Sequence, residues 1–367
     1  MVDTVPMTRV GITMVMLNYT GGMDRTGVRI DFVAINDVEP ALRERINSFG
    51  SKLYVIPGRN RRPLRYVWKL TRLIRRNGYQ VVHAHGNSCT LAVELLAAWL
   101  GGAKVRCPHS HNTTCTAPRA NRLLRPLFER LYTHGFACGE AAGRWLFRDR
   151  PFEVLKNGID AAQYAFDADV RRVYRAKLGL DGCVAVGHVG LFIEQKNHRF
   201  LIEAFAKAHA ANPSLRLVLA GDGPLQPEMR ALAQAKGLED AVLFLGVRQD
   251  IPQLLSAMDA MALPSLYEGL PNVLIEWQAN GLNALVSDKV TEEAQLTGLL
   301  RYIPLDESAW AEVLAQSTPA DDRAEASAKA AAAIAEAGYD IKAAAGRLRR
   351  LYETYVNDAS DAKPSAS

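Results

Sequence analysis

The chain has 367 residues, of which 49% are apolar and 23% charged, so it has the composition of a soluble protein and the length for two domains. Residues 1–158 carry 24 Lys and Arg against 11 Asp and Glu, whereas the remainder carries 20 against 28, so the net charge of +5 hides a basic half that suits an anionic surface. No apolar run reaches the roughly 18 residues of a membrane span, and five cysteines without C-x-x-C spacing argue against a disulfide framework or a thiolate zinc site. We expect a cytoplasmic protein.

The first 58 residues predict three strands and one helix. Apolar segments bounded by polar residues or glycine are expected to form strands at residues 2–7, 28–36 and 52–58. Residues 14–19 suit a helix, and Gly11 lies in the turn in front of it. The first of these strands is short for a sheet of the kind predicted below.

Eight basic residues and no acidic one lie between Arg59 and Arg76. Their spacing predicts a helix on which Arg65, Lys69, Arg72 and Arg76 form one cationic stripe beside an apolar side. Such a helix suits peripheral contact with an anionic membrane, and it equally suits a surface helix whose apolar side docks on the sheet. Nucleic acid is the weaker alternative, because no binding motif and few aromatic residues accompany the charge.

Two predicted strand ends each carry a pair of histidines, His83 with His85 and His109 with His111. Because side chains alternate along a strand, both members of a pair point to the same side. Paired histidines serve as metal ligands in hydrolases, together with carboxylates. A metal-dependent hydrolase is therefore a rival hypothesis, although no Asp or Glu adjoins either pair.

The second half alternates predicted strands with helical segments, which is the pattern of a doubly wound parallel sheet. A strand and an Asn-Gly turn at residues 152–160 close the first half. Further strands are expected at residues 184–190, 215–223, 242–247, 260–265 and 284–288. An Ala-rich helix at 324–337 and an amphipathic helix at 339–357 follow, and the tail 358–367 is expected to be disordered.

One unit of this half, residues 261–288, combines a strand, a polar turn, a short helix and a second strand. Pro271 before the helix and Gly281 after it are the proline-first, glycine-last signature of helix ends. The turn at residues 265–270 is therefore expected at the carboxyl edge of the sheet, where parallel α/β proteins bind ligands.

Two carboxylates flank the start of that helix, Glu268 in the turn and Glu276 within the helix. The free amides of Asn272 and Val273 attract an anion such as phosphate. Carboxylates accept hydrogen bonds from hydroxyl groups, so a ligand with hydroxyls on both sides of a phosphate fits this turn. A nucleotide sugar is such a ligand.

The spacing Glu268-Gly-Leu-Pro-x4-Glu276 resembles the Glu-x7-Glu motif of retaining glycosyltransferases of family 4. In that family the first Glu and the amides after it hold the transferred sugar, and the second Glu holds the ribose. The resemblance implies an α/β GT-B fold: two Rossmann-like doubly wound domains, an inter-domain cleft and a C-terminal crossover helix. It also implies that a histidine in a setting like PHSHNT touches the donor sugar, for which His111 is the better match and His109 the alternative.

The strand end at Gly190 resembles the family's diphosphate-binding loop, Gly-Arg-x4-Lys. Lys196 matches the lysine, but Leu191 stands where the arginine is expected. Loss of one such contact raises a barrier by roughly 3 kcal/mol. Either another cation, such as Arg9 or Arg248, substitutes for the arginine or turnover is slow.

Two further loops, at 221–224 and 246–250, resemble those that bracket the nucleotide base. The residues expected to bind the donor are Gly190, Lys196, Arg248, Glu268, Gly269, Leu270, Asn272, Val273 and Glu276. Those expected to act in catalysis are Glu268, His111 and Lys196, and Gly11 and His109 are expected in acceptor-side loops.

We therefore predict an acceptor-binding domain at 1–155, completed by the helix at 339–357, and a nucleotide-sugar domain at 156–338. The predicted reaction is retaining transfer of a hexosyl unit from a nucleotide sugar, with UDP favoured over GDP, to a saccharide acceptor. No metal or other cofactor is expected. The acceptor is expected to be lipid-linked and to belong to a bacterial exopolysaccharide or capsule, as for similar transferases. A catalytically idle nucleotide-sugar binder is the third hypothesis, suggested by Leu191 and the short first strand.

Overall fold

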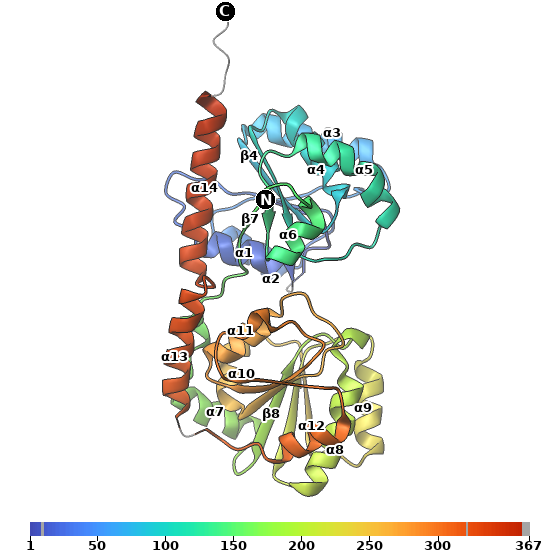
Figure 1. Ribbon diagram of the computed structural model, residues 1–367, viewed down its shortest axis with the longest axis vertical. Coiled ribbons are helices and arrows are strands. Elements are labelled where there is room, and N and C mark those ends of the chain that lie inside the picture. The colour runs from blue at the N-terminus through green and yellow to red at the C-terminus, as the bar shows by residue number, and fades with distance from the viewer. Residues whose placement is uncertain (9–10, 321, 362–367) are drawn as a thin grey trace, which may run out of the picture. The chain divides into compact units, whose positions relative to one another are not determined.

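Two parallel sheets, each with helices packed on it, organise the chain (Figure 1). The computed structural model describes residues 1–8, 11–320 and 322–361. Unit 1 consists of residues 1–158 with 338–367, and unit 2 consists of residues 159–337. The last helix therefore belongs to the same unit as the first strand, as the GT-B resemblance implies.

Within the described residues, unit 1 holds a seven-stranded parallel sheet in the order β3-β2-β1-β4-β5-β6-β7. The strands are β1 (Val2–Asp3), β2 (Phe32–Ala34), β3 (Leu53–Val55), β4 (Val81–Gly86), β5 (Val105–Ser110), β6 (Phe136–Ala137) and β7 (Glu153–Val154). The helices are α1 (Ile12–Gly22), α2 (Pro40–Ser48), α3 (Pro63–Asn77), α4 (Ala92–Gly101), α5 (Pro118–Leu131), α6 (Glu140–Phe147) and α14 (Ile341–Asp361), and the 3-10 turn η1 (Cys89–Leu91) precedes α4.

Alternation along β4 assigns the two faces of this sheet. Val82 and Ala84 pack into the apolar cluster that α3, α4 and α5 share. His83 and His85 point to the other face, where His83 contacts Tyr352 of α14. Because consecutive strand residues point to opposite faces, one strand serves both helical layers.

Within the described residues, unit 2 holds a six-stranded parallel sheet in the order β10-β9-β8-β11-β12-β13. The strands are β8 (Val184–Val189), β9 (Leu215–Ala220), β10 (Val242–Gly246), β11 (Ala260–Leu263), β12 (Asn283–Ser287) and β13 (Leu300–Ile303). The helices are α7 (Ala168–Leu178), α8 (His198–Ala211), α9 (Gln226–Ala235), α10 (Ile251–Ala257), α11 (Asn272–Ala279), α12 (Glu307–Ala315) and α13 (Arg323–Glu336). The 3-10 turns are η2 (Ala161–Tyr164), η3 (Glu194–Lys196) and η4 (Glu292–Ala294).

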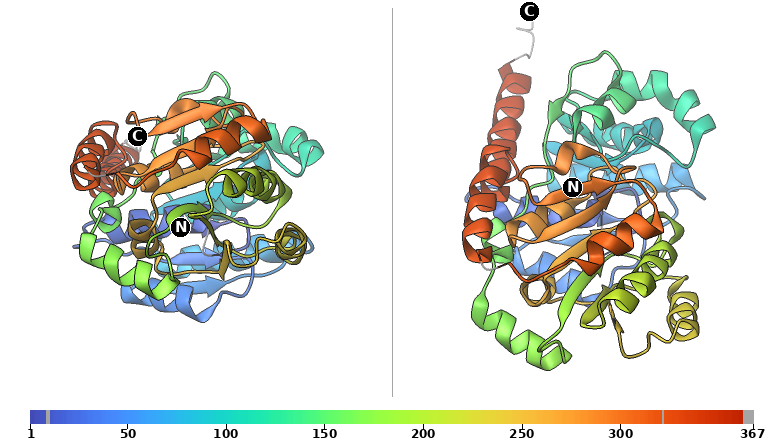
Figure 2. Two further views of the ribbon diagram at one scale, coloured as in Figure 1. Left: turned by 90° about the horizontal axis from the view of Figure 1, so that it is seen from below. Right: turned by 60° about the horizontal axis from the view of Figure 1, so that its bottom comes forward.

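Apolar side chains of the unit 2 strands pack against α8, α9 and α12. Phe205 of α8 and Trp310 of α12 are fully buried there with Leu217 and Leu219 of β9. Figure 2 shows α12 alongside α8. The remaining helices pack in pairs, α7 on α10 and α11 on α13. The loops that follow the strands are thus held by a rigid core.

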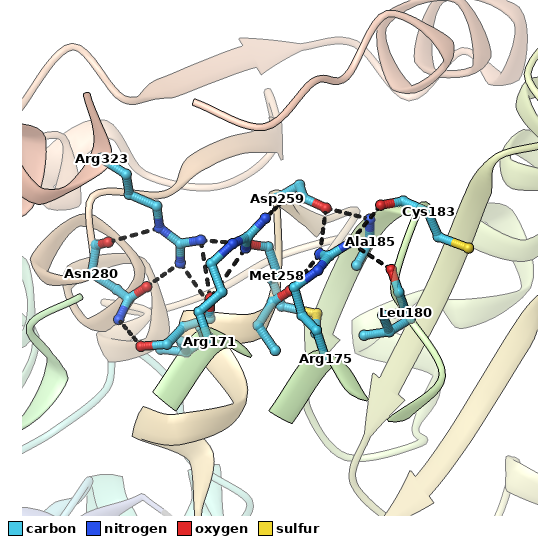
Figure 3. A network of polar contacts seen from close by, with 12 residues as sticks. Arg171, Arg175, Leu180, Cys183, Ala185, Met258, Asp259, Asn280 and Arg323 are labelled. Atoms are coloured by element: carbon cyan, nitrogen blue, oxygen red, sulfur yellow. Dashed lines mark hydrogen bonds and ion pairs between the residues drawn. The ribbon is translucent and has the colours of Figure 1, made fainter. Parts of the chain in front are cut away.

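A buried polar network joins α7, α13 and the residue before β11 (Figure 3). The fully buried carboxylate of Asp259 pairs with Arg171 and with Arg175, the latter at 3.0 Å. Arg323 pairs with the side chain and the carbonyl of Asn280. Burial lowers the pKa of Arg323 to about 9.

The same three arginines cap the carboxyl end of α10. The last carbonyls of a helix lack helical partners and carry its negative partial charge, so cations stabilise them. The accepting carbonyls belong to Leu255, Ser256, Ala257 and Met258. The network therefore fixes the start of β11, the strand that leads into the turn of Glu268.

Several predicted elements have other bounds in the structure: the strands predicted at 28–36 and 52–58, for example, span only Phe32–Ala34 and Leu53–Val55. For the first strand the structure also shows the cause. The first strand, predicted over residues 2–7, ends at Asp3: the N–H of Val5 bonds the Asp3 carboxylate at 3.1 Å, and Pro6 has no N–H to donate. The predicted tail begins at residue 358, but α14 runs to Asp361 and the remaining tail lies outside the described residues. None of the helices in the described ranges is both long and apolar enough to cross a membrane.

Arg59 differs from the sequence prediction, which placed it in the cationic surface of residues 59–76. Its guanidinium binds the carboxylate of Glu94 at 2.7 Å, and Glu94 has no exposed surface. The acidic partner comes from α4, so the local sequence gives no sign of it. Arg59 pins the loop before α3 to α4 and is not available to a membrane.

Candidate functional site

The loops after β8 and β9 lie side by side at the carboxyl edge of the unit 2 sheet. Gly190 donates its N–H to the carbonyl of Ala220 at 3.0 Å, and Phe192 donates to Asp222 at 3.0 Å. A Cβ atom on Gly221 would lie 1.8 Å from the carbonyl oxygen of Gly190, so only glycine permits this approach. The predicted loops at 190 and 221–224 therefore form one surface.

Gly190 also lies beside two side chains, and a larger residue there would come too close to the first of them, His188. A Cβ atom there would lie 2.9 Å from Nε2 of His188 and 3.4 Å from Cδ of Lys196. His188 shares a hydrogen bond of 2.8 Å with the carbonyl of Ala262 through Nδ1. Burial lowers the pKa of His188 to about 4, so this imidazole is neutral at pH 7.

The turn η3 is fastened to the segment after β11. Asn197 adopts a left-handed conformation with φ of 54°, and its amide donates to the carbonyl of Pro264 at 3.2 Å. The N–H of Leu266 donates to the carbonyl of Gln195 at 2.9 Å. These two bonds bring segments about 70 residues apart into register.

Lys196 and Glu268, the two principal predicted residues, are in direct contact. Nζ of Lys196 lies 2.6 Å from Oε1 of Glu268, and their side chains are only 16% and 9% exposed. The amide of Gln195 donates to Oε2 of Glu268 at 3.1 Å and to the carbonyl of Tyr267 at 3.0 Å. The carboxylate is thus held by one charged and one neutral donor. No sequence signal singles out Gln195, because a glutamine in a polar loop is ordinary.

The helix α11 begins directly after the turn of Glu268. Its first backbone hydrogen bond is donated by Leu274 to the carbonyl of Pro271, so the amides of Asn272 and Val273 precede it. The side-chain oxygen of Asn272 is buried without a partner among the described residues. Gly269 is exposed and Leu270 is half-buried in the same turn. This helix start supplies N–H groups of the kind that bind anions.

Glu276, on the same helix, is partly buried. Burial raises the pKa of its carboxyl to about 7, and a hydrogen bond with Tyr164 of η2 opposes this shift. The neutral form is therefore favoured in the folded chain relative to the unfolded chain. A ligand hydroxyl that donates to Glu276 would favour the ionised form.

The raised pKa of Glu276 predicts a pH dependence of stability. Between about pH 4.5 and 7 the folded state retains a proton that the unfolded state has lost, so stability falls as pH rises through this window. As pH rises over that range, the midpoint temperature of the wild type should fall relative to that of Glu276→Gln. Above pH 7 the difference between the two midpoint temperatures should stay constant. Thermal unfolding at several pH values measures it. A difference that does not change between pH 4.5 and 7 would contradict the assignment.

Arg248 and Arg9 were the two candidates for a second cation at the diphosphate. Arg248 is already paired: its Nε lies 2.8 Å from Asp250, which also accepts a hydrogen bond from Tyr174 at 2.7 Å. Arg9 lies outside the described residues. Leu191 is 42% exposed and places an apolar side chain next to Gly190. Lys196 is thus the cation that the structure places at the Glu268 carboxylate.

Unit 1 brings its four predicted histidines into one cluster, which we call the histidine tetrad. His83 and His85 stack with ring centroids 4.1 Å apart, and so do His109 and His111. The two stacks are joined by ring nitrogens, 3.1 Å apart between His83 and His109 and 2.9 Å apart between His85 and His111. The hydroxyl of Tyr352 bonds His83 from α14. The predicted same-side orientation of each pair is confirmed.

Three members of the tetrad, His83, His85 and His109, are buried, His111 is partly buried, and all four imidazoles are neutral at pH 7. Burial lowers the pKa of all four imidazoles, that of His111 to about 3. One ring nitrogen each of His83, His85 and His109 lies within 4.8 Å of the others, so these three could hold a metal ion, and this group contains no carboxylate. A hydrolytic metal centre of the predicted kind would include carboxylates, so the tetrad fits that rival hypothesis only in part.

Gly11 stands immediately before α1. It has a φ of 60°, and its carbonyl accepts a hydrogen bond from Met14 at 3.1 Å. The positive φ favours glycine at this position. Gly11 thus shapes the loop that the sequence assigned to the acceptor side.

The fold and the site define a class of protein. Residues 10–163 match the family model described as Glycosyltransferase Family 4, and residues 183–317 match the one described as Glycosyl transferases group 1. The chain belongs to the family 4 glycosyltransferases, and it has the GT-B fold that the Glu-x7-Glu spacing implied.

Particular relatives extend this result over nearly the whole chain. The chain is 36% identical over 363 residues to the putative glycosyltransferase EpsF of Bacillus subtilis, covering 94% of each protein. It is 30% identical over 235 residues to an Escherichia coli α-1,3-galactosyltransferase named for a GlcNAc-diphosphoundecaprenol acceptor, covering 60% of each. Anabaena HepE, solved with UDP, has a similar fold with a TM-score of 0.77 at 20% identity, covering 96% of this chain and 98% of HepE.

Proposed function

We propose that the chain catalyses retaining transfer of a hexosyl unit from a UDP-sugar to a saccharide acceptor. The observation that carries the proposal is the contact of Lys196 with Glu268, in the turn that leads into the amides of Asn272 and Val273 at the start of α11. A cation, a hydroxyl acceptor and anion-binding amides are the groups that a nucleotide sugar requires. The match to family 4 models supports the same activity.

Each of these groups has a separate role in the proposed reaction. Glu268 accepts hydrogen bonds from sugar hydroxyls, and the amides of Asn272 and Val273 hold a phosphate. Lys196 turns from Glu268 towards the diphosphate, whose negative charge grows as the bond to the sugar breaks. The oxygen of the acceptor hydroxyl forms the new bond to the anomeric carbon of the sugar as the bond from that carbon to the phosphate oxygen breaks. The departing phosphate oxygen takes the hydroxyl proton, so no separate base is required. The lysine supplies the positive charge, so transfer proceeds without a metal.

Relatives support the choice of donor and acceptor. HepE has been solved with UDP and with UDP-glucose, which favours a uridine donor. The E. coli relative and a Campylobacter jejuni relative are named for diphosphoundecaprenol-linked acceptors. We infer a lipid-linked saccharide acceptor and a role in bacterial exopolysaccharide synthesis, which the resemblance to similar transferases also implies.

Thermal unfolding with nucleotide ligands tests the proposed donor. At a hundred times its dissociation constant a ligand stabilises its protein by about 2.7 kcal/mol. UDP and one UDP-hexose should each raise the midpoint temperature of the wild type. The UDP-hexose should leave the midpoint temperature of Glu268→Ala little changed. Equal shifts with UDP, GDP and ADP would contradict a uridine site. A raised midpoint temperature together with no product in a transfer assay would identify a catalytically idle nucleotide-sugar binder.

Replacing Leu191 by arginine is expected to improve the enzyme. The side chain is exposed beside Gly190, so an arginine fits there and adds a second cation for the diphosphate. A hydrogen bond to a charged group contributes about 1.5–3 kcal/mol, so kcat/KM should rise roughly 10- to 100-fold. Leu191→Gln, which adds polarity without charge, is the control. An equal gain in both variants, or none in either, would contradict this role.

The helix α3 supports peripheral contact with an anionic membrane. Leu64 is 86% exposed and Trp68 is 58% exposed. Exposure of such large apolar side chains to water is unfavourable, so a surface that covers them would stabilise them. The guanidinium of Arg72 lies over the Trp68 ring, 5.5 Å from its centroid. Exposed apolar and cationic side chains on one helix suit the headgroup region of a bilayer. Leu70 and Ile74 are instead buried against the sheet, so α3 also docks as a surface helix.

Removal of positive charge from α3 should weaken vesicle binding. Each Lys or Arg near an anionic surface contributes about 1 kcal/mol, so the pair Arg65→Gln and Arg72→Gln should lower the partition coefficient roughly 30-fold. Co-sedimentation with phosphatidylserine vesicles at low salt measures it. The matched control is Arg172→Gln with Arg301→Gln in unit 2, which removes the same charge elsewhere. Equal losses in the two double variants would refute a specific contact through α3.

A further inference from the structure

A chain of hydrogen bonds runs from α14 through one half of the histidine tetrad. The hydroxyl group of Tyr352 contacts Nδ1 of His83, and Nε2 of His83 lies 3.1 Å from Nδ1 of His109. Nε2 of His109 is buried and has no partner among the described residues. We call Tyr352, His83 and His109 the relay. It begins on α14 and ends at an open ring nitrogen.

The relay runs towards the carboxyl edge of the unit 1 sheet. In the register of β4 with β5, His83 is opposite Cys107 and His85 is opposite His109, so His109 lies two residues nearer that edge than His83. In the strand order of this sheet the direction of the chain reverses between β1 and β4. Parallel α/β sheets bind ligands outside the carboxyl ends of the strands at such a switch point. His109, one residue before the end of β5, therefore lies at the edge where a ligand is expected.

The protons of the relay are assigned by counting donors and acceptors. Burial lowers the pKa of both imidazoles, so each is neutral and carries one N–H and one bare nitrogen. Among the described residues, His83 is the one hydrogen-bond partner of the Tyr352 hydroxyl. If this hydroxyl donates to Nδ1 of His83, Nε2 of His83 carries the proton and donates to Nδ1 of His109. Nε2 of His109 then carries the proton of that ring.

The opposite assignment leaves more buried groups unpaired. Nδ1 of His83 would donate to the oxygen of Tyr352, and Nε2 of His83 would accept from His109. The hydroxyl proton of Tyr352 would then lack a partner within the described part of the chain, and Nε2 of His109 would be bare. Burial of a polar group without a hydrogen bond is costly, so the first assignment is favoured. Tyr352 thereby determines that His109 presents an N–H.

The same assignment separates two kinds of ligand that a histidine cluster can bind. A metal ion requires bare ring nitrogens, but both nitrogens of His83 and Nδ1 of His109 take part in hydrogen bonds. A metal ion could bind these atoms only after both bonds had broken. An oxygen atom with a lone pair can accept from the N–H of His109 without any change in the relay. The relay therefore fits a ligand oxygen better than a metal ion.

We propose that Tyr352, acting through His83, is a positioning residue that fixes His109 as the Nε2–H tautomer, and that this N–H donates to a hydroxyl oxygen of the bound saccharide. The identity of the ligand rests on the proposed transferase function, whereas the relay does not. In the other tautomer Nε2 could only accept, so the saccharide hydroxyl would have to turn its own proton towards His109. The tautomer thus sets the direction in which that hydroxyl donates.

Nuclear magnetic resonance of isotope-labelled histidine in the full chain, without substrate, tests the relay, because protonated and bare ring nitrogens have distinct chemical shifts. In the wild type His83 and His109 should both carry the proton on Nε2. Tyr352→Phe should give a mixture of tautomers at both residues. The control Tyr355→Phe, on the same helix but with its ring stacked on His134, should change neither. A wild-type His109 with its proton on Nδ1, or an unchanged His109 in Tyr352→Phe, would overturn the relay.

Steady-state kinetics of the same two variants test the ligand. Loss of one neutral hydrogen bond should lower kcat/KM about 2- to 10-fold in Tyr352→Phe and leave it unchanged in Tyr355→Phe. A rise in KM for the UDP-hexose alone would assign the hydroxyl to the donor, and a rise for the acceptor alone would assign it to the acceptor. Unchanged kinetics in Tyr352→Phe, with the mixture of tautomers present, would overturn the contact with the saccharide. A wild type that transfers no sugar would contradict the proposed function, and the resonance measurement would still decide the relay.

Discussion

Replacing Lys196 by alanine is expected to lower kcat for sugar transfer by about 10²- to 10³-fold. The side chain is only 16% exposed and lies against Glu268, so its charge acts in a partly desolvated site. Preorganised donors aimed at a developing charge contribute about 2.7–4 kcal/mol each to the barrier. The diphosphate gains charge as it leaves, so the loss should appear chiefly in kcat and less in KM.

Lys207→Ala provides the control for Lys196→Ala. Lys207 also belongs to an ion pair in unit 2, with Glu307 at 2.8 Å, but its side chain is 51% exposed. Steady-state kinetics with a UDP-hexose should show kcat close to that of the wild type for this control. If Lys196→Ala kept kcat within a few-fold of the wild type, the lysine would not stabilise the leaving group.

Replacing Asp259 by alanine is expected to destabilise unit 2 by about 3–5 kcal/mol. The carboxylate has no exposed surface and is paired with Arg171 and Arg175. Removal of one partner of a buried ion pair leaves an uncompensated charge in the interior. For a unit of this size the midpoint temperature should fall by roughly 10 °C.

Two further variants make the Asp259 prediction specific. Asp240→Ala removes an exposed carboxylate and should change stability by less than about 0.5 kcal/mol. Asp259→Asn keeps the shape and removes the charge, so it should lie between the wild type and Asp259→Ala. Calorimetry of the three variants decides the matter. A loss below 1 kcal/mol in Asp259→Ala would show that the arginines are stabilised by the α10 carbonyls alone.

The fold was accessible from the sequence because its signals are local. Alternating strand and helix patterns predict the parallel sheets, and Pro271 and Gly281 predict the ends of α11, which spans Asn272–Ala279. The contact of Lys196 with Glu268 follows from topology, because both residues come after strands whose carboxyl ends meet at one edge. The first strand was less accessible, since the Asp3 carboxylate bonds the backbone that would otherwise extend it.

The polar networks were not accessible, because their partners are distant in sequence. Arg175 and Arg323 occur on amphipathic helices, where arginine usually marks a solvated face, and their partners are mostly backbone carbonyls. Arg59 likewise has the sequence setting of a solvated cation, but the structure pairs it with the buried carboxylate of Glu94. The histidine tetrad depends on strand register, and Tyr352 lies 269 residues from His83. Such contacts require the tertiary structure.

In the proposed function, Glu268 and Lys196 hold an activated sugar for transfer. The most direct measurement is the release of UDP from a UDP-hexose in the presence of a saccharide acceptor, with product identified by mass spectrometry. We predict acceptor-dependent release by the wild type, a loss of at least about 100-fold in Glu268→Gln, and no loss in Glu239→Gln, which alters an exposed carboxylate. Equal release by the wild type and Glu268→Gln would show that Glu268 does not hold the sugar.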